Sequence, residues 1–170
     1  MAKRVIMVIP PEKFRDEEYL EPRDLFQERG IDVRTASKIT GLAYGMLGAT
    51  VDVNFNYNNI SVENFDAIVF VGGSGASVYF DDPVAMKLAK DFYAAKKIVA
   101  AICIAPSILA NAGILQGKNA TAFSSESSNL RAKGAYYTGE DITQDGRIIT
   151  AKGPSAAKQF AETIAQALGQ

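Results

Sequence analysis

The stretch Ile98-Val-Ala-Ala-Ile-Cys-Ile-Ala-Pro-Ser107 contains the strand-to-helix turn that decides the fold class. Its first half, Ile98–Ile102, is a continuous apolar run, which is typical of a strand covered on both faces of a sheet. Pro106 then suits the first turn of a helix, where a missing N–H costs nothing. A buried strand that leads directly into a helix indicates an α/β protein with a mostly parallel sheet.

The same alternation of apolar runs and segments of helical period extends along the chain. The apolar runs predict further strands at Val5–Ile9, Asp32–Ala36, Ala67–Val71 and Ile148–Ala151. Helical periodicity predicts helices at Pro22–Arg29 (starting as early as Glu18), Pro83–Ala95 (capped by Asp81 or Asp82), Ala105–Ala112 and Ser155–Leu168. Residues 38–60 are expected to form a β-hairpin excursion, Asn119–Phe123 a short strand and Glu126–Lys133 a short helix. We therefore predict one domain, residues 1–170, in which helices cover both faces of the sheet.

The composition excludes several kinds of site. The chain contains no histidine and one cysteine, so it has no Cys–His or Ser–His pair, no His-ligated metal and no internal disulfide. We expect no metal and no cofactor. The 18 basic and 19 acidic residues are mixed along the chain, which argues against nucleic acid and membranes as partners. The apolar run before Pro10 is too short for a signal peptide, and we expect a cytoplasmic protein.

The single cysteine, Cys103, directly follows the buried strand. Ala101 and Ala105 stand two residues before and two residues after it, where a nucleophile elbow needs small side chains. The thiol would then lie at a helix N-terminus, where the dipole and free amides favour the thiolate. The alternative is a buried core cysteine without chemical function.

A glycine turn, Phe70-Val-Gly-Gly-Ser-Gly-Ala76, follows the third expected strand. The adjacent Gly72 and Gly73 would let backbone amides approach a ligand or a developing oxyanion, or they would simply permit a tight turn. A dinucleotide fingerprint fits poorly, because Val78 stands where its third glycine belongs.

The turn after the first strand, Pro10 to Pro22, is acidic. It carries five carboxylates at the edge of the sheet where Cys103 is expected: Glu12, Asp16, Glu17, Glu18 and Glu21. Most of them suit a solvated helix start. One carboxyl group buried beside the thiol would instead have a raised pKa and could shuttle a proton.

These features together resemble the ThiJ/PfpI superfamily, which includes the Parkinsonism-associated protein deglycase and archaeal intracellular peptidases. The resemblance is collinear over nearly the whole chain. It rests on the following segments: Arg4–Ile9, Glu18 four residues before Pro22, Asp66–Gly73, the elbow Ala100–Pro106, and Asp145–Pro154 with the final helix. The resemblance implies a flavodoxin-like three-layer sandwich that forms a homodimer.

The resemblance also implies roles for individual residues. Cys103 would be the nucleophile, and Glu18 the carboxyl group hydrogen-bonded to its sulfur. The amides of Gly73 and Ile104 would be candidates for the oxyanion site, with Gly72 as a further backbone residue of that site. Arg15, Pro154, and Ala122 or Phe123 would lie at the substrate pocket.

The chain departs from the family pattern at several of these positions. Ile104 replaces the histidine that follows the cysteine in peptidases, and Ala122 or Phe123 replaces a histidine of the deglycase-like branch. Arg15 replaces a common acidic residue, and it could pair with Glu17, Glu18 or an anionic substrate.

The resemblance implies three functions for this site. The first is action on reactive α-oxoaldehydes, as in a glyoxalase III-like hydration of methylglyoxal, or on early glycation adducts, as in a deglycase. It would proceed through a Cys103 hemithioacetal with Glu18 as proton relay. The second is a redox-sensing stress-response or chaperone-like protein whose cysteine oxidises to sulfinate. Peptide hydrolysis is the third, and it is disfavoured because no histidine can protonate the leaving amine.

Overall fold

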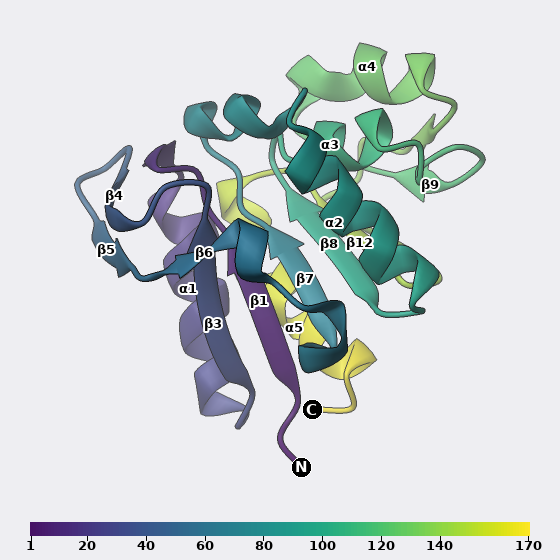
Figure 1. Ribbon diagram of the computed structural model, residues 1–170. Helices are drawn as coiled ribbons and strands as arrows, with labels where there is room; N and C mark the ends of the chain where they lie inside the picture. The colour runs from purple at the N-terminus through teal and green to yellow at the C-terminus, as the bar shows by residue number, and fades with distance from the viewer.

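The computed structural model describes all 170 residues and has a seven-stranded sheet at its centre (Figure 1). All neighbouring strands are parallel except the edge strand β11, which runs antiparallel to β12. In spatial order the strands are β11 (Ile142–Asp145), β12 (Ile148–Ala151), β8 (Ile98–Ile102), β7 (Ala67–Phe70), β1 (Arg4–Val8), β3 (Asp32–Ser37) and β6 (Phe55–Asn56). The expected α/β sandwich with a mostly parallel sheet is confirmed.

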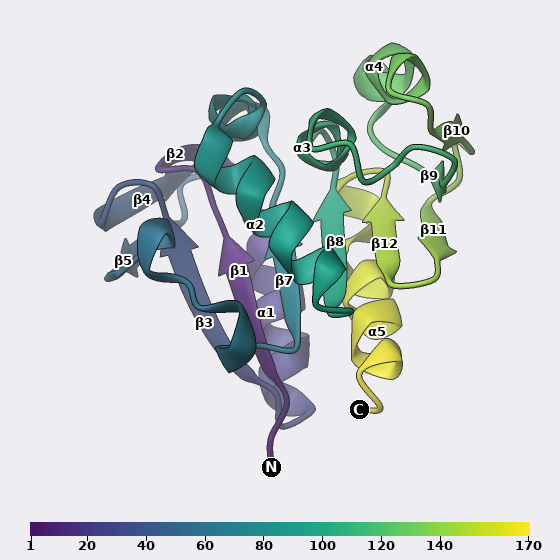
Figure 2. The same cartoon turned by 45° about the vertical axis from the view of Figure 1, so that its right-hand side comes forward.

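Two layers of helices cover the sheet, and the alternation of side chains along β1 explains both. Val5 and Met7 face a core shared with α1 (Asp16–Glu28) and α5 (Ala157–Ala167). Ile6 and Val8 face the opposite core, which is closed by α2 (Pro83–Ala94), α3 (Pro106–Asn111) and α4 (Ser127–Ala132). Figure 2 shows the sheet between these two layers. None of the helices has the length and the apolar character that crossing a membrane requires.

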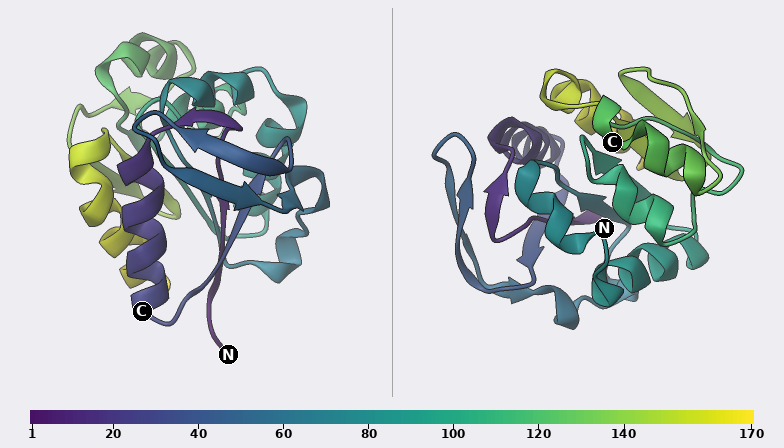
Figure 3. Two further views of the ribbon diagram at one scale, coloured as in Figure 1. Left: turned by 90° about the vertical axis from the view of Figure 1, so that its left-hand side faces the viewer. Right: turned by 90° about the horizontal axis from the view of Figure 1, so that it is seen from above.

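A small second sheet extends from the carboxyl edge of the main one (Figure 3). The expected hairpin is formed by β4 (Gly41–Gly45) and β5 (Thr50–Val53), and β2 (Glu12–Phe14) joins it in parallel with β4. The buried Asp16 carboxylate fastens the tip of this hairpin to α1, because it accepts hydrogen bonds from the amides of Leu47 (2.9 Å) and Ala49 (2.8 Å).

Helix α1 begins six residues before Pro22, where the sequence predicted its start, and two residues before Glu18. Two carboxylates in its first turn, those of Asp16 and Glu17, favour this early start because they complement the helix dipole. Pro22 lies inside the helix, so the hydrogen bond that its N–H would donate to the Glu18 carbonyl is missing. The stretch between Pro10 and Pro22 is therefore a short strand and two helical turns, not an irregular loop.

The remaining elements are short. The strand expected at Asn119–Phe123 is only two residues long as β9 (Asn119–Ala120), and it pairs in parallel with β10 (Tyr136–Tyr137). The short helix expected nearby is α4, and β2, β6, β10 and β11 were not predicted as separate strands. Single turns of 3₁₀ helix lie at Tyr57–Asn59, Val62–Asn64, Ser124–Glu126 and Pro154–Ala156, and a longer one at Ser74–Tyr79.

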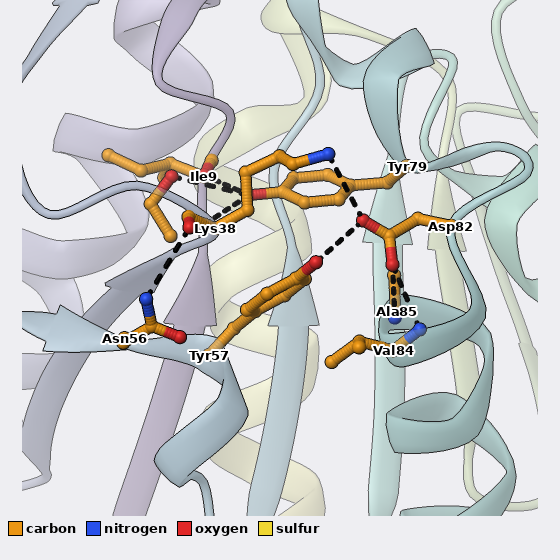
Figure 4. A network of polar contacts seen from close by, with 9 residues as sticks. Ile9, Lys38, Asn56, Tyr57, Tyr79, Asp82, Val84 and Ala85 are labelled. Carbon is orange, nitrogen blue, oxygen red and sulfur yellow. Dashed lines mark hydrogen bonds and ion pairs between the residues drawn. The ribbon is translucent and has the colours of Figure 1, made fainter.

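A polar network holds the segment that follows the glycine turn (Figure 4). The Tyr79 hydroxyl donates to the Ile9 carbonyl at 2.8 Å and accepts from the Lys38 amide at 3.1 Å. Asp82 caps α2, as expected, by accepting from the first amides of the helix, and it also accepts from the Tyr57 hydroxyl at 2.8 Å. These bonds tie the glycine turn to β1 and β3, so its position at the sheet edge is firmly set.

Candidate active site

Cys103 lies immediately beyond the carboxyl end of β8 with its backbone in the left-handed region, at φ 65°. Residues other than glycine rarely adopt this backbone conformation, because it destabilises the fold by about 1 kcal/mol. Ala101 and Ala105 are fully buried on either side, as the elbow requires. The Cys103 amide donates to the Ala151 carbonyl of β12 at 3.0 Å, which holds the strained residue in place.

The side chain of Glu18 reaches the elbow from the first turns of α1, and it is completely buried. Gly72 separates the two groups: a Cβ atom on Gly72 would lie 2.3 Å from the Glu18 Oε1 atom and 2.5 Å from the Cys103 Cβ atom. Only glycine leaves the room for this approach. The structure thus brings together Glu18 and Cys103, which are 85 positions apart in the sequence.

The carboxyl group of Glu18 is in an unusual electrostatic environment. Burial raises its pKa to about 8, although the Cys103 thiol and the Arg15 guanidinium favour the charged form. Neither carboxyl oxygen has a hydrogen-bond partner of good geometry. Because this pKa lies above neutral pH, the group holds its proton in the folded protein at pH 7.

The pKa of the Cys103 thiol is raised, whereas the sequence led us to expect a lowered one. Burial and the nearby Glu18 carboxylate raise its pKa to about 12, and the Gly73 and Ile104 amides only partly oppose this. The two amides act in the direction expected from the sequence, but burial and the adjacent Glu18 carboxylate outweigh their effect on the pKa. The two groups share a site that tolerates one negative charge more readily than two.

The backbone amides near the sulfur divide into two groups. The amides of Gly73 and Ile104 point to the Cys103 sulfur, where both lower its pKa. The Gly72 amide lies near the Glu18 carboxyl group, where it lowers the pKa of that group, and its place in the oxyanion site stays a prediction. Gly73 has a φ of 102° and packs so closely on β2 that a Cβ atom would lie 2.3 Å from the Arg15 amide nitrogen.

A cavity of about 430 Å³ opens above the thiol. Of the expected pocket residues, Arg15, Phe123 and Pro154 line it, but Ala122 does not. Ala122 is fully buried, whereas Phe123 is partly exposed to the cavity; which of the two corresponds to the family histidine stays a prediction. The complete lining is Arg15, Met46, Gly73, Ser74, Ser77, Phe80, Cys103, Ile104, Phe123, Ser125, Glu126 and Pro154.

Arg15 stands at the N-terminus of α1 and pairs with Glu17. Its Nε and Nη2 atoms donate to the two carboxylate oxygens of Glu17 at 2.9 and 3.0 Å. This pairing lowers the pKa of Glu17. Of the partners that the sequence allowed for Arg15, the structure shows Glu17.

Glu126 is a pocket residue that the sequence did not indicate. It belongs to the 3₁₀ turn before α4, and its carboxylate accepts from the Ser107 hydroxyl at 2.6 Å and from the Ser125 hydroxyl at 2.8 Å. Met46, from the tip of the β4–β5 hairpin, was missed as well. The local sequence holds no signal for either residue, because each reaches the pocket through the tertiary fold.

Two further observations bear on the location of the site. No three His, Cys, Asp or Glu side chains come together in an arrangement that could hold a metal ion. A larger hollow of about 620 Å³, beside Lys13 and Lys38, adjoins the pocket at Ser74 but does not include Cys103. We therefore take the pocket above Cys103 as the candidate active site.

The fold and this pocket define a class: flavodoxin-like α/β proteins with a cysteine at a strand-to-helix elbow and a carboxyl group beside it. Residues 3–167 match the model of the DJ-1/PfpI family, and the chain belongs to that family. Uncharacterized protein MJ0967 of Methanocaldococcus jannaschii is 38% identical over 168 residues, which span 97% of this chain and 82% of that protein.

Two other similar proteins are one that is named for an activity and one whose structure has been solved. Deglycase PYRAB04690 of Pyrococcus abyssi is 28% identical over 149 residues, or 88% of this chain and 90% of that protein. The crystal structure of a ThiJ/PfpI domain protein from Brachyspira murdochii superimposes with a TM-score of 0.96 at 34% identity, covering 99% of this chain and 97% of that one. The flavodoxin-like fold expected from the resemblance is thereby confirmed.

Proposed function

We propose that this protein is a cysteine-dependent enzyme that acts on α-oxoaldehydes, or on the early adducts that they form with amines and thiols. The observation that carries the proposal is the completely buried Glu18 carboxyl group, which approaches Cys103 across Gly72, with Cys103 itself lining an open pocket. The name of the Pyrococcus abyssi relative, a deglycase, agrees with such a substrate class. Of the residues proposed for the site, Cys103, Gly73, Ile104, Arg15, Phe123 and Pro154 line the cavity, which supports the proposal.

The first step is addition of the thiol to the aldehyde. In the singly charged state of the pair, one proton is shared between Cys103 and Glu18, and the reactive arrangement has it on the carboxyl group. The thiolate attacks the aldehyde carbon, the Gly73 and Ile104 amides face the oxygen that becomes negative, and Glu18 supplies the proton. The product is a hemithioacetal, and Glu18 is left as a carboxylate.

The second step isomerises the hemithioacetal. The Glu18 carboxylate takes the proton from the former aldehyde carbon and returns it to the adjacent ketone carbon, while the hydroxyl proton moves from the first oxygen to the second. The result is a 2-hydroxy thioester on Cys103. Water then attacks this thioester, releasing the 2-hydroxy acid and the free thiol, so the net reaction consumes one water and needs no oxidant.

The same geometry lends less support to the other functions. Peptide hydrolysis requires an acid that protonates an amine leaving group, and the pocket contains no histidine for this purpose. A peroxide sensor depends on a thiol that is readily ionised, whereas burial and Glu18 raise the pKa of Cys103. We therefore favour the carbonyl chemistry, in which Glu18 supplies a proton during the attack itself.

The test measures lactate formed from methylglyoxal by the wild type, Cys103→Ser and Glu18→Gln. We expect turnover by the wild type and a loss of at least about 100-fold in each variant, since each lacks one of the two reacting groups. Circular dichroism and thermal unfolding of the variants serve as the folding control. Absent turnover in the wild type, or turnover that persists in both variants, would contradict the proposal.

The pH dependence provides a second test. Because the pair loses its first proton with a pKa of about 8, kcat/KM for methylglyoxal should rise with pH and level off above that value. The Glu18→Asp variant keeps a carboxyl group but shortens its reach, so it should retain an inflection at a much lower rate. A wild-type profile that is flat between pH 6 and pH 9 would exclude this pair as the reacting groups.

A further inference from the structure

The candidate pocket has an uncompensated negative charge. Apart from Cys103, only Arg15 and Glu126 among its lining residues ionise. The guanidinium of Arg15 is neutralised by both carboxylate oxygens of Glu17. Glu126 makes no ion pair. A charged substrate entering this pocket therefore meets a free carboxylate and a guanidinium that is already engaged.

The Glu126 carboxylate is held in one orientation by neutral donors. Ser107, which is fully buried on α3, donates to one oxygen at 2.6 Å, and Ser125 donates to the other at 2.8 Å. The Ser107 hydroxyl itself accepts from the Asn129 amide at 3.1 Å, and Asn129 donates to Asn111 at the same distance. Hydroxyl donors orient a carboxylate without cancelling its charge, so it remains available to a cation.

Backbone bonds connect this carboxylate to the nucleophile. The Phe123 amide donates to the Cys103 carbonyl at 2.8 Å, and the Glu126 amide donates to the Phe123 carbonyl at 2.9 Å. Ser107 is four residues beyond Cys103 in the chain. Phe123 is 45% exposed and lines the same pocket, so an aromatic residue and a carboxylate border one cavity. A carboxylate and an aromatic ring together form a favourable environment for an organic cation.

We infer that Glu126, together with Phe123, recognises a positively charged nitrogen on the substrate. The preferred substrates are then carbonyl compounds that carry an ammonium or guanidinium group, rather than neutral or anionic ones. This inference rests on the proposed function and specifies its substrate class. Arg15 does not select anionic substrates in this arrangement, because binding one there would compete with its bidentate pair to Glu17.

The test compares two aryl glyoxals of the same shape, 4-(trimethylammoniomethyl)phenylglyoxal and its neutral isostere 4-neopentylphenylglyoxal. Initial rates are measured with the wild type, with Glu126→Gln, and with Glu63→Gln, which removes an exposed carboxylate at the opposite edge of the sheet. The amide oxygen introduced by Glu126→Gln still accepts from a serine hydroxyl, so the turn should remain folded. Binding of unreactive benzyltrimethylammonium is followed in parallel by NMR titration.

We expect the wild type to prefer the cationic glyoxal about tenfold in kcat/KM, through KM, as a nearby opposite charge would produce. The preference should disappear in Glu126→Gln and persist in Glu63→Gln, and Glu63→Gln should convert the neutral glyoxal at the wild-type rate. Equal use of the two glyoxals by the wild type, or a preference that survives in Glu126→Gln, overturns the inference and leaves the proposed function standing.

Failure of the wild type to convert either glyoxal contradicts the proposed function instead. The NMR titration then decides the inference by itself. The affinity for benzyltrimethylammonium is obtained from the chemical-shift change of Phe123. Binding to the wild type that is about tenfold tighter than to Glu126→Gln supports a cation site, and equal affinity for the two proteins overturns the inference.

Discussion

The Glu18→Gln substitution should change how the stability of this protein depends on pH. The pKa of Glu18 is about 8 in the folded protein, compared with 4.5 for an ordinary glutamate. In the unfolded chain the carboxyl group therefore ionises first as the pH rises, while the folded protein keeps its proton. The stabilisation is fully present below pH 4.5 and is lost progressively until the pH passes the folded-state value.

The magnitude follows from the difference between the two pKa values. Each unit of difference corresponds to about 1.36 kcal/mol, so the free energy of unfolding should fall by about 5 kcal/mol between pH 4 and pH 8.5 through Glu18 alone. Glutamine has no proton to lose. The Glu18→Gln variant also buries an amide without partners, but that cost is independent of pH and moves the whole curve without changing its slope.

The assay is urea unfolding at half-unit intervals from pH 4 to pH 8.5, at one fixed protein concentration, for the wild type and the variant. The other titrating groups cancel in the difference between the two proteins. The upper limit also keeps folded Cys103 protonated in both proteins, since burial, the largest cause of its raised pKa, is present in the variant as well. We expect the variant to gain about 5 kcal/mol relative to the wild type over this range.

Glu17→Gln is the matched control with the opposite sign. The pKa of Glu17 is lowered by its bond to Arg15, so its ionised form stabilises the folded protein above the unfolded-state pKa, and that contribution disappears in acid. A difference between the wild type and Glu18→Gln that stays constant from pH 4 to pH 8.5 would refute the reasoning. It would mean that Glu18 is ionised in the folded protein at neutral pH.

Three further predictions concern the framework of the site, each measured by urea unfolding. Gly72→Ala should destabilise the protein by about 1–3 kcal/mol, because the added Cβ would lie 2.3 Å from the Glu18 Oε1 atom; a normal stability would contradict the close packing. Asp82→Ala should cost about 1–2 kcal/mol, because it removes the cap of α2, whereas Tyr57→Phe, which keeps that cap, should cost less. Cys103→Gly should be more stable than Cys103→Ala by about 1 kcal/mol, because glycine relieves the φ of 65°, and the reverse order would argue against strain at the elbow.

The sequence predicted the central strands well, and the reason is their burial on both faces. Ile98–Ile102 and Ile148–Ala151 are strands with the bounds that were expected, since each apolar run ends where the chain leaves the sheet. The edge strand β11, Ile142–Asp145, was missed because only one of its residues is fully buried. An edge strand that is half exposed has no continuous apolar run to reveal it.

The start of α1 could not be located from local pattern alone. Pro22 suggested the first helical turn, but the preceding residues are helical because tertiary contacts bury them. Asp16 binds the hairpin tip, and Glu18 lies beside the thiol. Both are acidic residues, and from the sequence alone such residues are ordinarily expected at the surface. Their burial became visible only when the hairpin and the elbow were placed against the helix.

The candidate site was predictable where it depends on the elbow and the glycine turn, and less so where it depends on distant segments. The spacing around Cys103 predicts its conformation, and the positive φ confirms that prediction. The roles of Cys103 and Glu18 in a reaction remain predictions. Glu126 reaches the pocket through hydrogen bonds from the elbow to Phe123, a relation between segments that no local pattern contains.

The hydrogen bond from the Cys103 amide to the Ala151 carbonyl has a consequence for biosynthesis. The elbow leaves the ribosome well before β12, the strand that holds it in its strained conformation. Phe123 and Pro154, which wall the pocket, also emerge after the thiol. In a nascent chain, Cys103 is therefore made before the strand that holds its strained conformation and before two of the residues that wall its pocket.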